Sequence, residues 1–131
     1  MKKNSKPEEI FKKQILAYLL RNGFDIDVIE SKAVYSQKLR RYMHSQATPG
    51  MSDLIGNDPS GHACFIELKA PKKLKTLREN QRMFLVRKIE SNAFACVVDS
   101  IEMFVQIYSD WKHYKLQGEF EARQFLLNML P

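Results

Sequence analysis

The chain has 131 residues, of which 44% are hydrophobic, and 21 Lys and Arg outnumber 15 Asp and Glu to give a net charge of +6. This length and composition fit one domain with a real core and argue against a disordered chain. No apolar run reaches the ~18 residues of a membrane span, and no apolar segment of signal-peptide length follows the basic N-terminus, so the expected location is the cytoplasm. The charge favours a polyanionic partner, nucleic acid first, but fits a merely basic soluble protein equally well.

The first third of the chain predicts a helix, a strand and a polar loop. Residues 7–22 are expected to be helical, because Ser5 and Glu8 fit a capping box and an early proline suits the first turn. A strand is expected near residues 26–30. The polar, basic residues 36–48 are expected to form a mobile loop.

A β-hairpin is expected in the middle of the chain. The strands cover about residues 52–56 and 62–70, and the turn NDPSG between them is dense in turn-forming residues. Pro71 stops the second strand, because proline has no N–H to donate to a sheet.

The second half of the chain predicts helices around one more strand. Thr76 and Glu79 fit a capping box for a helix that runs to about residue 91. The apolar run AFACVV reads as a buried strand. The elements expected after residue 91 are a strand over 93–98, a short helix over 101–108 and a helix over 118–129. A strand that follows a crossover helix pairs in parallel, so the predicted fold is α/β, a central mixed β-sheet flanked by helices.

The cysteines and histidines do not predict a metal site. Cys64 and Cys96 lie in apolar runs and are expected to be buried free thiols, since two cysteines without a second ligand pair are not a zinc signature. His44, His62 and His113 are scattered without any metal-binding spacing, and each is expected to be an ordinary surface or core residue.

The charged residues of the hairpin carry the functional signal. Because strand side chains alternate between faces, Glu67 and Lys69 share a face, opposite to Ile66 and Leu68. A register that places Asp53 near Glu67 brings two carboxylates together beside one ammonium group.

Two neighbouring carboxylates repel each other and are costly to desolvate. Lys69 offsets one charge, and a divalent cation such as Mg²⁺ offsets the rest, since Mg²⁺ is commonly held by one or two carboxylates, waters and a substrate phosphate. Such an ion activates water for phosphoryl chemistry. The simpler alternative is a solvated strand face, on which a Glu-x-Lys pattern is common.

Three segments in this order resemble the PD-(D/E)xK nuclease superfamily: PGMSDLIG, FIELKAP and ENQRMFLVRKIESNAFACVVDS. The pattern is most similar to the VRR-NUC (virus-type replication-repair nuclease) group and is also similar to the archaeal Holliday-junction resolvases. The resemblance covers roughly residues 8–105 and implies a restriction-endonuclease-like core. Residues 110–131 then form a helical extension of one nuclease domain that spans the whole chain.

The resemblance implies roles for individual residues. Asp53 and Glu67 match the metal-binding acids, the Leu68 carbonyl a further metal ligand, Lys69 the catalytic lysine and Gln81 the glutamine of the following helix. The first element reads Ser-Asp rather than Pro-Asp, which leaves the aspartate itself in place.

Two of these assignments have alternatives. The resemblance implies a further glutamate from the first helix, where Glu8 and Glu9 both fit. Because the capping box would occupy Glu8, we choose Glu9 as the catalytic and metal-binding residue. Gln81 shares the inward face of its helix with Leu77 and Phe84, so it is equally a buried glutamine with satisfied hydrogen bonds.

Basic residues around the hairpin are expected to contact phosphates of DNA, which gives sequence-independent, salt-sensitive affinity. Each of them, taken singly, also fits a solvated surface cation. They are Lys72, Lys73 and Lys75 after the hairpin, Arg78 and Arg82 on the next helix, and Arg40 and Arg41 in the expected loop.

The sequence therefore predicts an endonuclease that uses Mg²⁺ or Mn²⁺ to hydrolyse phosphodiester bonds in DNA. The resemblance implies a structure-selective repair enzyme for branched, flapped or Holliday-junction-like DNA, working as a homodimer. The size of the chain suggests a stand-alone enzyme of a bacterial or phage-infected cell. Two alternatives stay open: a nucleic-acid-binding module that keeps the nuclease fold without turnover, and an interaction protein for acidic partners. The interaction protein leaves the acid cluster unexplained.

Overall fold

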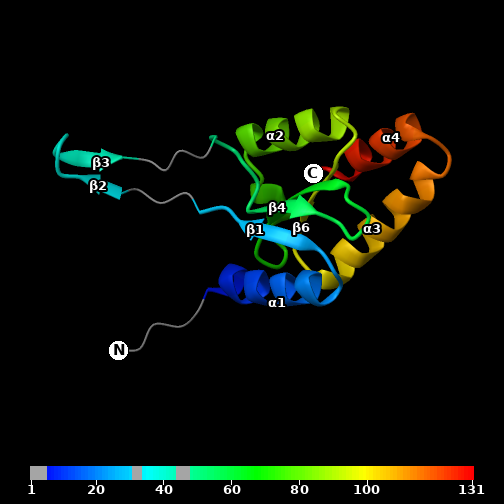
Figure 1. Ribbon diagram of the computed structural model, residues 1–131, viewed down its shortest axis with the longest axis horizontal. Helices are drawn as coiled ribbons and strands as arrows, with labels where there is room; N and C mark the ends of the chain where they lie inside the picture. The colour runs from blue at the N-terminus through cyan, green and yellow to red at the C-terminus, as the bar shows by residue number, and fades with distance from the viewer. Residues whose placement is uncertain (1–5, 31–33, 44–47) are drawn as a thin grey trace.

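The computed structural model describes residues 6–30, 34–43 and 48–131 (Figure 1). Four strands form one sheet and four α-helices surround it. In chain order these elements are α1 (Pro7–Arg21), β1 (Asp25–Val28), β4 (Leu54–Asn57), β5 (Ala63–Leu68), α2 (Glu79–Glu90), β6 (Phe94–Val98), α3 (Ile101–Lys115) and α4 (Glu119–Met129). A short 3₁₀ helix, Leu74–Thr76, lies between β5 and α2.

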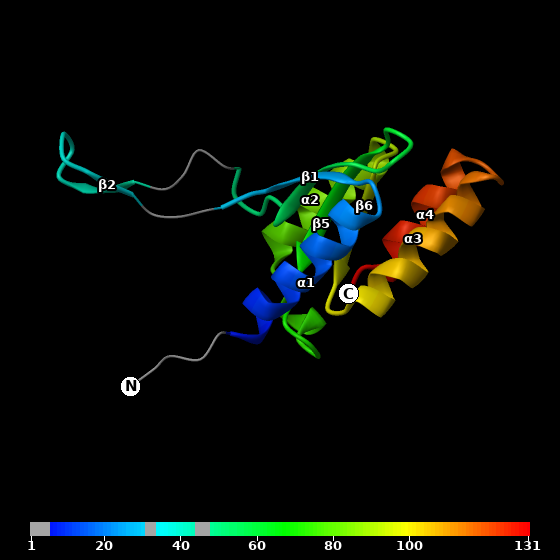
Figure 2. The ribbon, with the colours of Figure 1, turned by 60° about the horizontal axis from the view of Figure 1, so that its bottom comes forward.

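The sheet is mixed, as predicted. Its strand order is β1-β4-β5-β6, with antiparallel pairs up to β5 and a parallel pair between β5 and β6. Helix α2 covers one face, whereas α1 and α3 cover the other, and α4 packs against α2, α3 and β6 (Figures 1 and 2). The α/β class with a four-stranded mixed sheet and flanking helices is thus confirmed.

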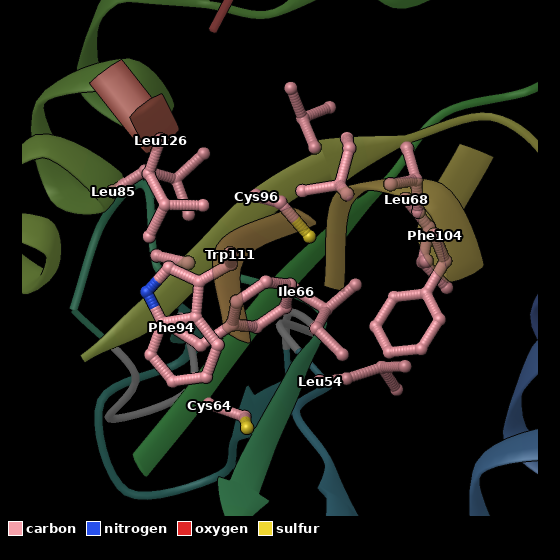
Figure 3. Close-up of a cluster of buried hydrophobic side chains, with 14 of the residues drawn as sticks. Leu54, Cys64, Ile66, Leu68, Leu85, Phe94, Cys96, Phe104, Trp111 and Leu126 are labelled. Carbon is pink, nitrogen blue, oxygen red and sulfur yellow. The ribbon is translucent and has the colours of Figure 1, made fainter. Parts of the chain in front are cut away.

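The main core lies between the sheet and the α1–α3 layer (Figure 3). Ile66 of β5 and Phe94 of β6 are fully buried there, and the Phe94 ring meets those of Phe104 and Trp111 of α3 edge to face. Ala122 and Leu126 of α4 belong to the same buried cluster. Cys64 and Cys96 lie within it as free thiols, as predicted.

The turn between β4 and β5 is closed by a buried carboxylate. Asp58 Oδ1 accepts hydrogen bonds from the backbone N–H groups of Ser60 and His62, at 2.9 and 2.8 Å. Its Oδ2 accepts from the Tyr108 hydroxyl at 2.8 Å and lies 2.8 Å from His62 Nδ1. His62 therefore has a structural partner, in line with its expected ordinary role.

Residues 34–43 form a hairpin that the sequence did not predict. Strands β2 (Val34–Ser36) and β3 (Arg41–Met43) pair antiparallel, where a mobile loop over 36–48 was expected. We call this hairpin the arm; it projects away from the sheet and helices in both views (Figures 1 and 2). Residues 44–47 of the expected loop lie outside the described residues.

Other boundaries also differ from the predictions. Helix α2 begins at Glu79 with Arg78 as its N-cap residue, so the predicted Thr76 capping box is wrong. The Thr76 hydroxyl instead donates back to the Lys73 carbonyl at 2.6 Å within the 3₁₀ helix. The N-cap residue of α1 is Lys6, without a side-chain bond, and Ser5 lies outside the described residues.

Helix α3 is about twice as long as predicted, because Trp111 continues the buried apolar face of Phe104 and Ile107 beyond residue 108. The first strand is β1 at Asp25–Val28, slightly earlier than the predicted 26–30. In the described ranges, no helix combines the length and apolar character that crossing a bilayer requires.

Candidate metal centre

Asp53 is fixed at the start of β4 by bonds on both sides. Its carbonyl accepts from the Ile29 N–H at 2.8 Å, which joins it to the end of β1. Its Oδ2 accepts from the Leu68 N–H at 2.9 Å. Because Leu54 pairs with Ile66, Asp53 lies beside Glu67, and this is the register on which the predicted site depends.

The turn before Asp53 packs tightly on helix α2. Gly50 has a φ of +82°, and a Cβ at this position would overlap the carbonyl oxygen of Asn80. Only glycine fits both the left-handed backbone and this close approach. The turn is thereby pressed against the first turn of α2, which carries Gln81.

Glu67 and Lys69 share the sheet face that α2 covers, as strand alternation predicted. The Lys69 ammonium donates to Gln81 Oε1 at 3.0 Å, and Gln81 Nε2 donates to Glu67 Oε2 at 3.0 Å. Lys69 Nζ also lies 3.6 Å from Glu67 Oε2. All three side chains are buried, with 3%, 8% and 8% of Glu67, Lys69 and Gln81 exposed.

The orientation of Gln81 follows from its place in α2. It is the third residue of the helix, and its Oε1 accepts from the Arg78 N–H at 2.9 Å, half of a capping box. With Lys69 donating to the same oxygen, Oε1 has two donors and Nε2 is left to face Glu67. Gln81 thus both caps α2 and links the two charged groups of the strand.

Glu67 keeps one oxygen without a partner. In the part of the chain that the structure describes, Oε1 of Glu67 is the one buried side-chain nitrogen or oxygen that forms no hydrogen bond. Burial, and next the charge of Asp53, raise the pKa of Glu67 to about 8, although Lys69 acts to lower it. A buried acceptor without a donor is costly, and a bound cation would remove that cost.

A cavity of about 450 Å³ opens beside the two acids. Asp53, Glu67 and Gln81 line it together with Glu9 of α1, whereas Glu8 is absent from its wall. The geometry therefore favours Glu9 over Glu8, as chosen from the sequence. Glu9 is exposed at the rim, unlike the buried Glu67.

Sequence reasoning missed three polar residues of the cavity wall. They are Lys12, Glu30 and Thr48. Lys12 follows Glu9 by three residues, so the helical i, i+3 spacing could have identified it. Glu30 lies before the arm, far from the motif in sequence, and Thr48 directly precedes the PGMSDLIG segment; no local signal indicates either of them.

The predicted basic residues are only partly brought to the cavity. Arg78 lines it. Lys72, Lys73 and Lys75 are exposed on the loop after β5, and Arg82 is half-buried on α2. Arg40 is exposed at the tip of the arm and Arg41 lies in β3. One predicted phosphate ligand, Arg78, therefore lines the cavity, whereas Lys72, Lys73, Lys75 and Arg82 do not belong to its wall.

The donor set suits one kind of ion. Among the residues described, no group of three or more His, Cys, Asp or Glu is placed to hold a metal. Asp53 and Glu67 supply two carboxylates, and Mg²⁺ and Mn²⁺ accept two carboxylates with waters and substrate phosphate. The Leu68 carbonyl faces the Asp53 side of β5, because the N–H and C=O of a strand residue point to the same neighbour.

Comparison of this chain with protein-family models, with curated proteins and with solved structures found no match to any of them.

Proposed function

We propose that this protein is a DNA endonuclease with a restriction-endonuclease-like core, which hydrolyses phosphodiester bonds with the help of Mg²⁺ or Mn²⁺. The observation that carries the proposal is the unpartnered Oε1 of Glu67, buried beside Asp53 at a cavity. An acid so placed is unfavourable for folding alone and is explained by a cation ligand. The order of the motifs along the chain supports the same reading.

The proposed roles follow from the contacts. Asp53, Glu67 and the Leu68 carbonyl would hold the ion, and Glu9 lines the same cavity from its exposed side. A bound divalent ion lowers the pKa of water and stabilises charge on phosphate. The Lys69 ammonium has three donors and spends one on Gln81 Oε1, so it retains donors for the attacking water or for the phosphate oxygens. Gln81 is a positioning residue that orients Glu67 and Lys69.

Substrate binding draws on the cations of the cavity wall. Lys12 on α1 and Arg78 on α2 both line the cavity, where they can pair with phosphates next to the one cleaved. Such contacts carry no sequence information, so structure selectivity for branched DNA rests on the resemblance. The net charge of +6 supports the choice of a polyanion.

A nucleic-acid-binding module without turnover is the second candidate. It is favoured by the same limited donor set, since only two carboxylates, Asp53 and Glu67, converge closely at the sheet in the described residues. It does not explain why an acid with a raised pKa faces a site meant for phosphate.

One cleavage assay separates these readings. Plasmid, linear duplex and four-way-junction DNA are incubated with Mg²⁺, Mn²⁺ or EDTA, using wild type, Asp53→Asn and Lys69→Ala. We expect metal-dependent cleavage by wild type and a loss of at least 10²-fold in either variant. Asp110→Asn and Lys112→Ala are matched controls on α3, away from the cavity, and should cleave normally. Cleavage that persists in EDTA or in both site variants sinks the proposed site, and binding without cleavage supports the second candidate.

A further inference from the structure

Among the strands that the structure describes, those of the arm form a sheet of their own and do not join the central sheet. The two strands of the arm pair only with each other, from Val34 opposite Met43 to Ser36 opposite Arg41. An isolated two-stranded hairpin is marginally stable in water, because it has no third strand or helix to pack on. A hairpin that projects in this way therefore gains stability from whatever binds it.

The charge of the arm identifies that partner as an anion. Residues 34–43 contain Lys38, Arg40 and Arg41 and no acidic residue. The four residues of the tip, from Gln37 to Arg40, are all exposed. Neighbouring like charges repel in the free protein, and this repulsion ends when an anion binds.

The backbone of the tip is also unusual. Arg40 has a φ of +52°, in the left-handed region that glycine or asparagine adopts more easily. An arginine here costs about 1 kcal/mol relative to glycine. A strained position that carries a cation is consistent with selection for charge over stability.

The arm is anchored at the candidate site. The chain that leads into it passes through Ile29 and Glu30, and the chain that leaves it continues into Thr48 and Pro49. All four residues line the cavity that also contains Asp53 and Glu67. Whatever occupies the cavity therefore lies directly at the base of the arm.

We propose that the arm binds double-stranded DNA next to the phosphate that is cleaved, an inference that rests on the proposed function for the substrate in the cavity. A two-stranded β-ribbon has the width that the major groove of B-DNA accepts. Lys38 and Arg40 at the tip then pair with backbone phosphates. The arm thus selects for a duplex on one side of the cut, irrespective of its sequence.

Chain geometry limits the length of that duplex. Eight residues lead from Glu30 to Lys38. At no more than about 3.5 Å per residue the tip reaches at most ~28 Å from the cavity, which corresponds to about 8 base pairs at ~3.4 Å each. A flanking duplex of about 8 base pairs is expected to be long enough for full contact, and a longer one to add nothing.

The test measures binding in EDTA, so that it does not depend on cleavage. Fluorescence anisotropy gives the affinity for single-stranded DNA joined to duplex flanks of 4, 6, 8, 12 and 16 base pairs. We expect the affinity of wild type to rise about 10- to 100-fold with flank length and to level off near 8 base pairs. In Lys38→Ala/Arg40→Ala this rise is lost, and the slope of log affinity against log salt on a 12-base-pair flank falls by about 1.8.

Two further variants separate charge from folding. Arg40→Gly relieves the backbone strain but removes one of the two tip cations. It should therefore still lose about half of the increase in log affinity with flank length. Arg21→Ala/Lys112→Ala removes one exposed Arg from the C-terminal end of α1 and one exposed Lys from the last turn of α3, and should keep the full rise. The arm lies on the other side of the sheet and helices from α3 in Figure 1. Circular dichroism checks that all variants fold.

The outcomes distinguish this proposal from the proposed function. Affinity that is independent of flank length in wild type, or a rise that survives in the double variant of the arm, overturns the proposal. Equal competition by polyglutamate and duplex DNA at equal charge also overturns it, in favour of an acidic protein partner. Affinity that rises with flank length, without cleavage in Mg²⁺, supports DNA binding by the arm and refutes the nuclease. Cleavage without this rise in affinity supports the nuclease and refutes DNA binding by the arm.

Discussion

The Glu67→Gln substitution gives the sharpest test of the metal centre, because it changes the charge of the buried group and almost nothing of its shape. The pKa of Glu67 is raised from 4.5 to about 8 in the folded protein. Because the pKa is raised in the folded state, the protonated Glu67 makes its full contribution to the free energy of unfolding below pH 4.5, and this contribution is lost as the pH rises to about 8. A shift of this size corresponds to at most about 5 kcal/mol at ~1.4 kcal/mol per pKa unit.

The variant carries a neutral amide at every pH and escapes this loss. In EDTA, we therefore expect wild type and Glu67→Gln to have similar free energies of unfolding at pH 5. At pH 9 the variant should be more stable by several kcal/mol, up to the bound of about 5. Urea denaturation at pH 5, 7 and 9 measures the difference, and Glu90→Gln, exposed at the end of α2, controls for a surface charge change.

Metal should narrow this difference in the free energy of unfolding at pH 9. Mg²⁺ or Mn²⁺ at about 100 times its dissociation constant stabilises wild type by about 2.7 kcal/mol. It should leave Glu67→Gln nearly unchanged, because the anionic ligand is gone. The reasoning is refuted if both proteins show the same pH dependence in EDTA, or if Glu67→Gln is the less stable protein at pH 9.

Three further predictions concern the supports of the site and of the fold. Gln81→Met removes the hydrogen bonds to Glu67 and Lys69. The affinity for Mn²⁺, measured by calorimetry, should therefore fall about 10- to 100-fold. An unchanged affinity would mean that Gln81 serves only to cap the helix. Asp58→Asn replaces an acceptor by a donor facing Tyr108 and His62 and should cost about 1–3 kcal/mol at pH 7 by urea denaturation. Although burial acts to raise it, the pKa of Asp58 is lowered from 3.8 by its bonds to His62 and Tyr108. The ionised Asp58 therefore stabilises the folded protein above pH 3.8 and loses this contribution below it. The difference in free energy of unfolding between wild type and Asp58→Asn should accordingly narrow in acid, and a constant difference would contradict this. Gly50→Ala should lower the melting temperature more than Gly61→Ala, because both glycines have positive φ but only Gly50 abuts another backbone; equal losses would show that the contact with Asn80 is unimportant.

The central hairpin was predictable because several local signals agree. The turn-forming residues and the alternation along β5 indicate the two strands of the hairpin, and the apolar run indicates β6 beside them. The structure has all three strands. The register was open from the sequence, since shifting a strand by one residue moves every side chain to the other face. Burial of Ile66 and Leu54 on the main core face decides it, and this also brings Asp53 beside Glu67.

The errors have physical causes that one sequence does not reveal. Thr76 and Arg78 both precede plausible first turns of α2, and the choice depends on Gln81, which turns back to the Arg78 N–H while it also binds Lys69. The sequence of the arm predicts a loop because its strands are only three residues long and residues 36–41 are polar or basic apart from Leu39. The cavity wall depends on tertiary packing, which brings residues 48–51 against α2 and the end of β1 against α1.

The charges of the site suggest why one acid keeps a raised pKa. With Glu67 protonated, the negative charge of Asp53 balances the positive charge of Lys69, and the buried group is neutral. A divalent ion beside ionised Glu67 gives a charge of +1, which one bound phosphate cancels. Neutral states are the least costly to bury, so ion and phosphate should bind more tightly together than separately.

The same balance requires that the ion displace a proton from Glu67. With a pKa of about 8, Mg²⁺ or Mn²⁺ binding should release nearly one proton per ion at pH 6.5 and about one tenth at pH 9. Calorimetry in buffers of different ionisation enthalpy measures this number, and Glu67→Gln is the control without the proton. Proton release that does not change between these pH values would mean that the ion binds without displacing the proton of Glu67, which contradicts the proposed site.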